Sequence, residues 1–546
     1  MVLDTCYGIQ PMGLQLTKQK RITRKKAIVT YAVNNDLMHK EPLLLKKEAF
    51  QFTSWQLTAR QICDIELLLN GAFTPLTGFL CEKDYNSVLN DMRLSDGTLW
   101  PIPIILDVSE AFAGSVFVGE KITLRDHEGF ALAVLTVSDI YRPVLKEEAQ
   151  KVYGTTDETH PAVNYLTNHS NPVYIGGTLE GIALPHHYDY QNDRHTPSEL
   201  KTIFKEKGWE KIVAFQTRNP FHRAHVEMTM RAVDELDAKL LIHPVVGITK
   251  PGDVDHYTRV RCYQHVLPKY PENTAMMSLL PLAMRMGGPR EALWHAIIRK
   301  NYGCTHLVVG RDHAGPGDDS KGNPFYGPYD AQDLLIEHKD EIGIEMVPFK
   351  FMVYLPSEDR YEAIDAVPKG VDFQTISGSE LRELLDEGKG IPEWFSYREV
   401  AQELEESRPP LTQRGFTLFF TGLSGSGKST LCMTLSGVYQ RDAGEIQIDG
   451  KHVSPTSPRQ AQLLGVSMMY QESNLVPELT VSANIALGRE SFVLNRHQTE
   501  VRVREILNRL DFHLDPSVKA SHLSGAQMQM AEIAKALYEE SKIIIM

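Results

Sequence analysis

Residues 211–225, KIVAFQTRNPFHRAH, carry the pattern that decides the fold of the central region. Residues 211–216 form a compact apolar run typical of a buried strand, and a polar turn leads to the helix-like pattern of residues 225–236. Further apolar runs of strand length follow at 239–246 and 305–309. Strands that alternate with helices predict a parallel α/β sheet, whose ligands bind at the carboxyl ends of the strands.

The flanking sequence predicts additional regions. A helical stretch at 58–70, ending at Gly71, leads into short apolar runs broken by proline and glycine, such as 101–108, 121–124 and 131–137, and such runs favour a β-rich domain. We predict an extension (1–40), a β-rich N-terminal domain (41–190), an α/β catalytic region (191–400), a charged linker (401–414) and a partial P-loop unit (415–546).

The composition is that of a folded protein with an acidic surplus. The chain of 546 residues has 57 Lys and Arg against 70 Asp and Glu, a formal net charge of −13. This balance argues against a protein that coats nucleic acid, because such binding depends on neutralising phosphates. Hydrophobic residues make up 42% of the chain, enough for sizeable cores.

Several observations predict a reduced, cytoplasmic protein. No run of about 18 apolar residues is present, so we expect no membrane span. The basic cluster at 18–26 has no long apolar stretch behind it, unlike a secretory signal. The 6 cysteines contain no CxxC pair, which argues against a disulfide framework or structural zinc.

Residues 216–225 follow a strand and open a helix, a place where free N–H groups and the helix dipole favour anions. His222 and His225 are spaced to share one helix face, and two imidazoles there can donate hydrogen bonds to phosphoryl oxygens as charge develops. Arg218 offers a planar fork for a tetrahedral oxyanion. The histidine pair can also be structural or bind a metal, although no third ligand is evident.

Residues 310–317, GRDHAGPG, form a second candidate site directly after the strand at 305–309. Glycines allow close approach of the backbone to a ligand, and Arg311 and His313 supply polar contacts. The same loop can be interpreted as a turn without function.

These segments, together with HPVVG (243–247), MRMGGPREA (284–292) and ISGSELR (376–382), closely resemble the ATP sulfurylase (sulfate adenylyltransferase) family. The resemblance extends to residues 57–79, 95–104, 249–259 and 392–396, and covers about 45–400. It implies a nucleotidyltransferase: sulfate attacks the α-phosphorus of MgATP, pyrophosphate leaves, and adenosine 5′-phosphosulfate forms. Family members are usually homo-oligomers, so we expect one here.

The resemblance also implies roles for single residues. The catalytic residues would be Thr217, Arg218, Asn219, His222 and His225, the last two as stabilisers of the transition state. Sulfate would be bound by Arg218 and by the backbone of Ala314. ATP would be bound by Gln216, Asn219, Gly310, Arg311, Asp312, His313 and Met352, and Mg²⁺ is implied by the nucleotide rather than by a visible ligand cluster.

Residues 422–429, GLSGSGKS, match the P-loop pattern after the apolar strand at 416–421 and before a helix. Lys428 would reach the β- and γ-phosphates, and Ser429 would contact Mg²⁺. A Gly/Ser linker is the alternative interpretation. The residues expected to bind ATP in this loop are Gly422, Leu423, Ser424, Gly425, Ser426, Gly427, Lys428 and Ser429.

The C-terminal unit resembles two families in succession. Residues 415–431 resemble adenylylsulfate kinase, whereas 435–451, 468–490 and 523–537 resemble the ATPase subunit of a sugar-importing ABC transporter, and the join falls inside GKSTL. Gln471 matches the Q-loop glutamine, and Ser524, Gly525 and Gln527 match the signature motif, with Ala526 where glycine is usual. The ABC-like part ends before the position of the Walker B carboxylates, so we expect nucleotide binding at best.

The sequence therefore predicts a multidomain α/β enzyme of sulfate assimilation, with ATP and sulfate as small-molecule substrates. It would combine a β-rich N-terminal domain, a nucleotidyltransferase-type parallel α/β catalytic domain and a partial P-loop NTPase unit. A bifunctional enzyme that makes phosphoadenylyl sulfate is the first alternative, and an ABC-type ATP-binding protein is the second.

Overall fold

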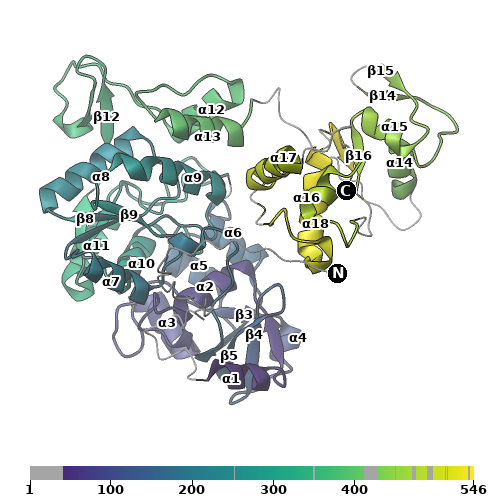
Figure 1. Ribbon diagram of the computed structural model, residues 1–546. Coiled ribbons are helices and arrows are strands. Elements are labelled where there is room, and N and C mark those ends of the chain that lie inside the picture. The colour runs from purple at the N-terminus through teal and green to yellow at the C-terminus, as the bar shows by residue number, and fades with distance from the viewer. Residues whose placement is uncertain are drawn as a thin grey trace, which may run out of the picture.

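The computed structural model describes residues 41–546, except residues 251, 349–350, 411–426, 449–450, 470–474, 489–495, 511, 513, 539–540 and 546. Figure 1 shows the N-terminal region in purple, the α/β region in teal and green, and the C-terminal unit in yellow-green and yellow. None of the helices in this part of the chain is long and apolar enough to cross a membrane. The mixture of helices and strands, with parallel pairing in the central sheet, confirms the predicted fold class.

The N-terminal region folds around a 6-stranded sheet in the order β1-β4-β5-β6-β2, and β3 also pairs with β6. All neighbours are antiparallel except β1 and β4. Its elements are α1 (Pro42–Ala49), β1 (Ser54–Gln56), α2 (Ala59–Leu69), β2 (Gly78–Phe79), α3 (Glu82–Asp91), β3 (Leu106–Val108), α4 (Glu110–Ala113), β4 (Lys121–Arg125), β5 (Ala131–Tyr141), α5 (Leu145–Tyr153), α6 (Pro161–Asn168) and β6 (Val173–Gly181).

Local sequence explains several of these elements. Thr58 caps α2, because its Oγ1 accepts the N–H of Gln61 at 3.3 Å while Gln61 Oε1 accepts the N–H of Thr58 at 3.0 Å. The predicted helix at 58–70 is thereby confirmed. Of the apolar run at 101–108, only Leu106–Val108 forms a strand, since Pro101 and Pro103 have no N–H to donate to a neighbouring strand.

The α/β region contains a 5-stranded parallel sheet in the order β11-β10-β7-β8-β9, which confirms the predicted parallel architecture. The strand predicted at 239–246 ends at Ile242, and beyond it Val245 forms only an isolated bridge with Leu280. The elements are η1 (Gln191–Asp193), α7 (Pro197–Glu206), β7 (Ile212–Phe215), α8 (Arg223–Leu236), β8 (Lys239–Ile242), α9 (His256–Val266), η2 (Leu267–Lys269), β9 (Ala275–Met277), α10 (Gly288–Asn301), β10 (His306–Val309), α11 (Asp330–Ile342) and β11 (Glu345–Pro348).

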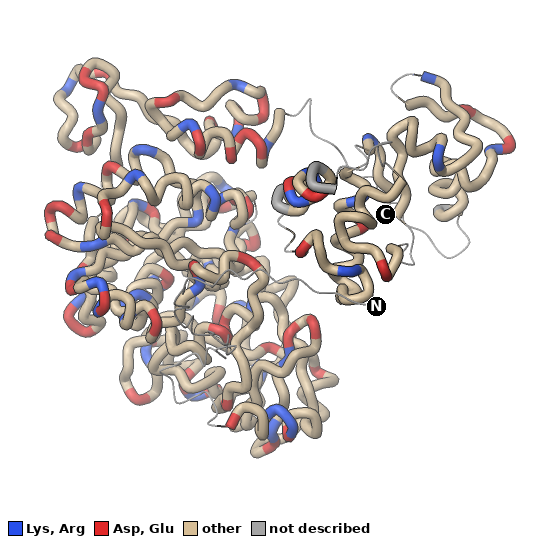
Figure 2. The backbone as a smooth tube through the Cα atoms, viewed as in Figure 1, with Lys and Arg blue, Asp and Glu red and all other residues tan. Residues whose placement is uncertain are grey.

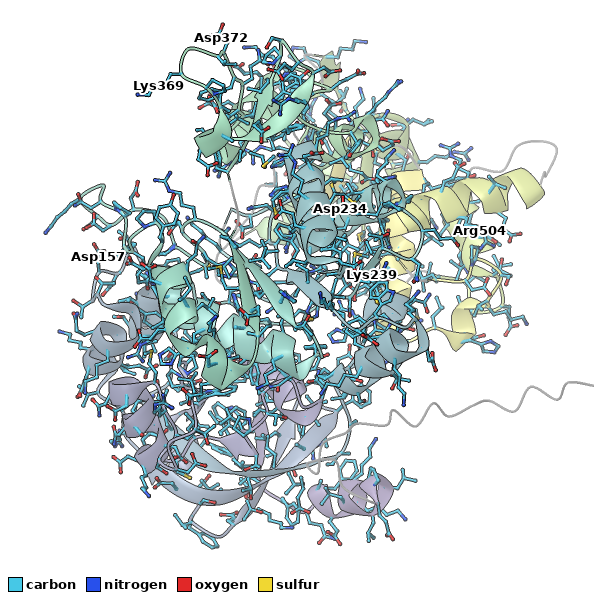
Figure 3. All side chains as sticks on the ribbon, turned by 90° about the vertical axis from the view of Figure 1, so that its left-hand side faces the viewer. Asp157, Asp234, Lys239, Lys369, Asp372 and Arg504 are labelled. Atoms are coloured by element: carbon cyan, nitrogen blue, oxygen red, sulfur yellow. The ribbon has the colours of Figure 1, made fainter. Side chains whose placement is uncertain are left out.

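One apolar core joins the N-terminal region to the α/β region. Phe73, which follows α2, packs on Trp294 of α10 with ring centroids 5.2 Å apart, and both side chains are fully buried. The same cluster includes residues of the 6-stranded sheet, β7 and β10. A loop contact adds to this interface: Asp157, labelled in Figure 3, accepts hydrogen bonds from the N–H and the hydroxyl of Ser320 at 3.1 and 2.6 Å.

A green lobe lies next to α8 and α9 in Figure 1. It consists of the antiparallel pair β12 (Met352–Leu355) and β13 (Arg360–Ala363), then η3 (Ile364–Ala366), α12 (Gly378–Glu387) and α13 (Arg398–Ser407). Val400, Ala401 and Leu404 of α13 are buried in the core that also contains Phe395. The helix therefore continues into the segment predicted as a linker, up to Ser407.

The C-terminal unit has a much smaller core. Its best packed part is a cluster between α16, α17 and α18 that includes Val481, Ile485 and Val503. Its elements are α14 (Lys428–Leu435), β14 (Ile446–Ile448), β15 (Lys451–Val453), α15 (Pro458–Leu463), β16 (Val466–Met468), α16 (Val481–Ala486), α17 (Arg496–Arg509), η5 (Ala520–His522), α18 (Gly525–Tyr538) and β17 (Ile543–Ile545).

Candidate active site

The loop after β7 is held in one shape by its own hydrogen bonds. Thr217 Oγ1 accepts the N–H of Asn219 at 3.0 Å and lies 3.1 Å from the carbonyl oxygen of the same residue. The hydroxyl of Tyr263, on α9, donates to that carbonyl oxygen at 2.8 Å. The predicted residues Gln216–Asn219 therefore sit on a preformed loop between the end of a central strand and the start of α8, and preformed loops bind ligands at a lower entropic cost.

Arg218 is positioned by a residue that the sequence analysis did not single out. Its Nη1 donates to Asp253 Oδ1 at 2.5 Å, and the two side chains are 23% and 12% exposed. Asp253 belongs to the segment 249–259, 35 residues away in the chain. Within the described residues, the remaining N–H groups of Arg218 form no hydrogen bond that would occupy them, so the guanidinium is oriented and still able to bind an oxyanion.

His222 and His225 lie against each other at the start of α8, with ring centroids 3.8 Å apart. His222 also stacks on Phe395, 4.6 Å between centroids. Burial lowers the pKa of His225 to about 4, and burial together with His225 holds the pKa of His222 well below its usual value. The backbone N–H of His222 donates to Nδ1 of His225 at 3.4 Å, so the proton of the neutral His225 ring is on Nε2.

The loop after β10 has an unusual backbone. Asp312 and Ala314 have φ values of 52° and 55°, a left-handed conformation that non-glycine residues adopt rarely and at a cost. Gly315 permits it, because a Cβ at that position would lie 2.0 Å from Asp312 Oδ1. Hydrogen bonds from Asp312 N–H to the carbonyl of Pro328 at 2.9 Å and from Gly288 N–H to the carbonyl of Ala314 at 3.2 Å hold the loop. Such strain is concentrated at functional loops.

The two loops meet through His295 of α10, a fully buried residue that the sequence analysis missed. His295 Nδ1 is 3.1 Å from His313 Nε2, and His295 Nε2 is 3.4 Å from Gln216 Nε2. β7 and β10 are neighbours in the sheet, so the structure brings the predicted segments 216–225 and 310–314 to one sheet edge. A signal was available, because Glu291, His295 and Arg299 recur every four residues and so share one face of α10.

Met352 lies elsewhere. Its side chain is 7% exposed and packs in the core that contains Phe221 and Ala224, next to α8 rather than with the β10 loop.

Local charge at the site comes from a few residues. Figure 2 shows Lys and Arg interspersed with Asp and Glu along the described chain. At the site, burial raises the pKa of Asp312, and the charges of Arg218 and Arg311 oppose that rise. Lys250 lies close by, and its Nζ donates to the carbonyl of Pro316 at 2.5 Å. A cluster of cations on an acidic protein suits anionic substrates.

The C-terminal candidate residues are only partly described. Gly422, Leu423, Ser424, Gly425, Ser426 and Gln471 lie outside the described residues, as does the side chain of Lys428. Gly427 has a φ of 86° and precedes α14, a conformation that glycine adopts readily. Ser429 is exposed.

The predicted signature motif caps a helix. Ser524 Oγ accepts the N–H of Gln527 at 3.3 Å, and Gln527 Oε1 accepts the N–H of Ser524 at 2.9 Å. Gly525 is the first residue of α18.

Among the residues that the structure describes, no group of three or more His, Cys, Asp or Glu side chains could hold a metal ion.

Comparisons with known proteins identify the families that the chain resembles. Family models described as ATP-sulfurylase, PUA-like domain and ABC transporter match residues 191–407, 30–184 and 412–546. A solved structure described as a hexameric APS kinase from Thiobacillus denitrificans superposes with a TM-score of 0.59 at 28% identity, over 93% of this chain and 89% of that chain.

Curated relatives are more similar still. The sulfate adenylyltransferases of Phaeosphaeria nodorum and Yarrowia lipolytica are 54% and 55% identical over 403 residues, 73% of this chain and 70% of each relative. That of Saccharomyces cerevisiae is 52% identical over 413 residues, 76% of this chain and 81% of the relative. With relatives this similar over most of their length, the chain belongs to the sulfate adenylyltransferase, or ATP sulfurylase, family.

Proposed function

We propose that this chain is a sulfate adenylyltransferase, which converts ATP and sulfate to adenosine 5′-phosphosulfate and pyrophosphate. The observation that carries the proposal is the convergence of Gln216–His225 and Gly310–Ala314 on one sheet edge, in a chain whose relatives carry this activity in their names. We further propose, as the sequence analysis predicts, that the enzyme acts in the cytoplasm.

The reaction needs no covalent intermediate on the protein. A sulfate oxygen forms a bond to the α-phosphorus while the bond from that phosphorus to the bridging oxygen breaks, and the electron pair leaves with pyrophosphate. The protein must hold two anions that repel each other and spread the developing negative charge. Arg218, held by Asp253, is suited to bind sulfate, and the strained backbone at Ala314 supports a second contact to it.

The histidine pair is suited to the transition state. Both rings are neutral near pH 7 because burial lowers the pKa of each. A neutral His225 with its proton on Nε2 is a hydrogen-bond donor, and a donor of this kind gains most when charge builds on a phosphoryl oxygen. We assign Thr217 and Asn219 to the same machinery through the loop that they form.

ATP would be bound by Gln216, Asn219, Gly310, Arg311, Asp312, His313 and the backbone of Met352. Mg²⁺ enters with the nucleotide as part of MgATP, because a triphosphate chelates the ion and supplies oxygen ligands of the kind it prefers. The donor set of the site, which is rich in cations and neutral imidazoles, fits a metal carried by the substrate.

We propose that the C-terminal unit binds nucleotide but carries out neither transport nor kinase chemistry. The match to an ABC transporter model over 412–546 supports a P-loop NTPase origin, and so does the position of Gly427 directly before α14, which begins with Lys428 and Ser429. An adenylylsulfate kinase that works in tandem with the first site is the second candidate, which the structural neighbour described as an APS kinase favours. That neighbour is described as hexameric, and we propose that this chain also forms a homo-oligomer.

Product analysis tests these proposals. Purified full-length protein is given MgATP and sulfate, with pyrophosphatase to pull the reaction forward, and the nucleotides are separated by ion-exchange chromatography. We expect adenylyl sulfate alone. Phosphoadenylyl sulfate would instead show an active kinase, and ADP with phosphate but no sulfonucleotide would overturn the main proposal.

A further inference from the structure

One face of α10 carries polar side chains inside an apolar core. Glu291, His295 and Arg299 follow each other at intervals of four residues, and all are fully buried. Burying such groups costs free energy unless hydrogen bonds compensate them. Their positions lie directly behind the two substrate loops, because His295 contacts both His313 and Gln216.

Glu291 is held as an ionised carboxylate. Its Oε1 accepts the backbone N–H of Arg285 at 2.9 Å, and its Oε2 accepts that of Gly287 at 2.7 Å. His295 Nε2 is 3.3 Å from Oε1. Burial opposes ionisation, but His295 and these backbone donors outweigh it and lower the pKa of Glu291.

The charge of Glu291 decides which ring nitrogens carry protons. A carboxylate repels a bare nitrogen lone pair, so His295 must present Nε2–H to Glu291 and keep Nδ1 as an acceptor. The contact of 3.1 Å to His313 then requires His313 to donate from Nε2. His313 is consequently the tautomer whose Nδ1 is an acceptor.

The same proton on His295 orients the amide of Gln216. Two donors cannot share the 3.4 Å contact between His295 Nε2 and Gln216 Nε2, and Gln216 Oε1 is buried without a partner among the described residues. Exchanging the two ends of the amide resolves both problems. Gln216 Oε1 then shares the single Nε2–H of His295 with Glu291 Oε1, and the NH₂ group becomes a donor where the unpartnered oxygen stood.

Arg299, one turn beyond His295, keeps these imidazoles neutral. Its Nη2 donates to the backbone carbonyl of His243 at 3.3 Å, and its Nε and Nη1 have no hydrogen-bond partner among the described residues. Burial lowers its pKa to about 10, so it is still a cation near pH 7. After burial, its charge is among the causes that lower the pKa of His295 and of His313.

We propose that Glu291 and His295 are positioning residues, which fix the tautomer of His313 and the amide orientation of Gln216 for ATP binding. The proposal rests on the proposed function, in which both of these residues bind ATP. One buried carboxylate thereby sets the donors and acceptors of two loops that are far apart in the chain. Loss of this pattern should weaken ATP binding in the ground state and the transition state alike, and so raise KM for MgATP more than it lowers kcat.

The test compares His295→Gln with His295→Leu. A glutamine amide has a donor and an acceptor at its end and can still connect Glu291 to His313, whereas leucine cannot. We expect His295→Leu to raise KM for MgATP by about tenfold, the effect of a misplaced hydrogen bond, and His295→Gln by about threefold or less. If the role were only packing, leucine would be the better tolerated residue in this apolar core, and His295→Leu would have both the higher thermal midpoint Tm and the lower KM. Under the proposal, His295→Leu has the higher KM even where its Tm is the higher of the two.

Glu291→Gln is the second variant, with Glu148→Gln as its matched control. Glu148 is also a buried carboxylate, which accepts hydrogen bonds from Tyr85 and Tyr174, but it contacts neither substrate loop. We expect only Glu291→Gln to raise KM for MgATP. Equal KM values for the two His295 variants, or an equal rise in Glu148→Gln, would overturn the proposal.

Calorimetric titration with MgATP separates this proposal from the proposed function. If the wild type binds MgATP but makes no adenylyl sulfate, the proposed function fails while the dissociation constants still test the positioning role. We expect the binding loss in His295→Leu to match its rise in KM. The Lys428→Ala variant removes the P-loop lysine, so MgATP binding by this variant reports on the first site. A Lys428→Ala variant that does not bind MgATP would overturn both the positioning role and the proposed function.

Discussion

The α/β region and the C-terminal unit each carry a predicted phosphate-binding motif that leads into a helix, but they differ in what supports it. Behind the loops at Gln216 and Gly310 lies a 5-stranded parallel sheet whose core continues into the N-terminal region. In the described part of the C-terminal unit, β16 and β17 form a pair of 3 residues each, and the core is one small cluster between helices. A motif specifies which atoms meet the ligand, whereas the surrounding core decides whether they are held ready for it.

Removing a transition-state donor should have the largest effect and sharpen this contrast. His225→Ala is expected to lower kcat for adenylyl sulfate formation by about 10²–10³-fold, the loss typical of such a donor, with a change in KM for MgATP of about threefold or less. Initial rates with pyrophosphatase coupling measure both. His127→Ala, at an exposed histidine of the N-terminal region, is the control. Equal losses in turnover and in ATP affinity would contradict the assigned role of His225.

The shared core predicts that damage to the N-terminal region will reach the active site. Phe73→Ala removes the ring that packs on Trp294 of α10, and we expect it to lower the free energy of unfolding by about 3–5 kcal/mol. Because α10 carries His295, activity near the unfolding temperature should fall as well. Urea titration followed by tryptophan fluorescence measures the change.

Ile485→Ala in the small cluster of the C-terminal unit is the matched comparison. It should destabilise that unit by about 2–5 kcal/mol without changing adenylyl transfer. A loss of adenylyl transfer in Ile485→Ala as large as that in Phe73→Ala would show that the two parts fold as one, against the contrast drawn above.

Sequence patterns predicted those strands, helices and loops whose formation depends on residues close together in the chain. The strand was visible because residues 212–215 form a continuous apolar run, and a polar turn separates it from the helix-like pattern that follows. Gln216, Arg218 and the histidine pair lie within ten residues of each other. The extent of α13 was missed because its charged residues face solvent while Val400, Ala401 and Leu404 pack in a core built mainly from other segments.

Partners across the chain were not predictable in the same way. Asp253 reaches Arg218 from 35 residues away, and His295 reaches Gln216 from 79. Only tertiary structure brings these side chains together, and no spacing rule within one element connects them. The proposed substrate residues were therefore within reach of the sequence, whereas the contacts of Asp253 and His295 with them were not.

Stability should depend on pH through Glu148 in the large core. Burial raises the pKa of its carboxyl to about 7, and the hydroxyls of Tyr85 and Tyr174 donate to it at 2.8 and 3.0 Å. The native state then binds a proton that the unfolded state releases near its ordinary pKa of about 4.3, so this group stabilises the fold less as pH rises from about 4.5 to 7.

Glu148→Gln, which is neutral at every pH, isolates that contribution. The free energy of unfolding of the variant minus that of the wild type should increase by a few kcal/mol between pH 5 and pH 8, because only the wild type loses the contribution of this group. Urea titrations at four pH values provide the measurement. A constant difference across this range would show that Glu148 titrates normally, in which case its environment is more solvated than that of a true core residue.

Helix caps offer the smallest effect and the finest comparison of the two regions. Thr58 caps α2 in the large core, and Ser524 caps α18 in the C-terminal unit, each with a glutamine three residues later that completes the reciprocal pair. Thr58→Ala and Ser524→Ala should each cost about 1 kcal/mol, because each leaves a helix N–H without its acceptor. If the two regions unfold independently, urea titration will show two unfolding transitions. Thr58→Ala will then shift only the transition in which adenylyl transfer is lost, and Ser524→Ala will shift only the transition of the C-terminal unit. A shift of both transitions by either variant would mean that the small cluster of the C-terminal unit is stabilised by the rest of the molecule, and that the contrast between the regions lies in ligand binding rather than in folding.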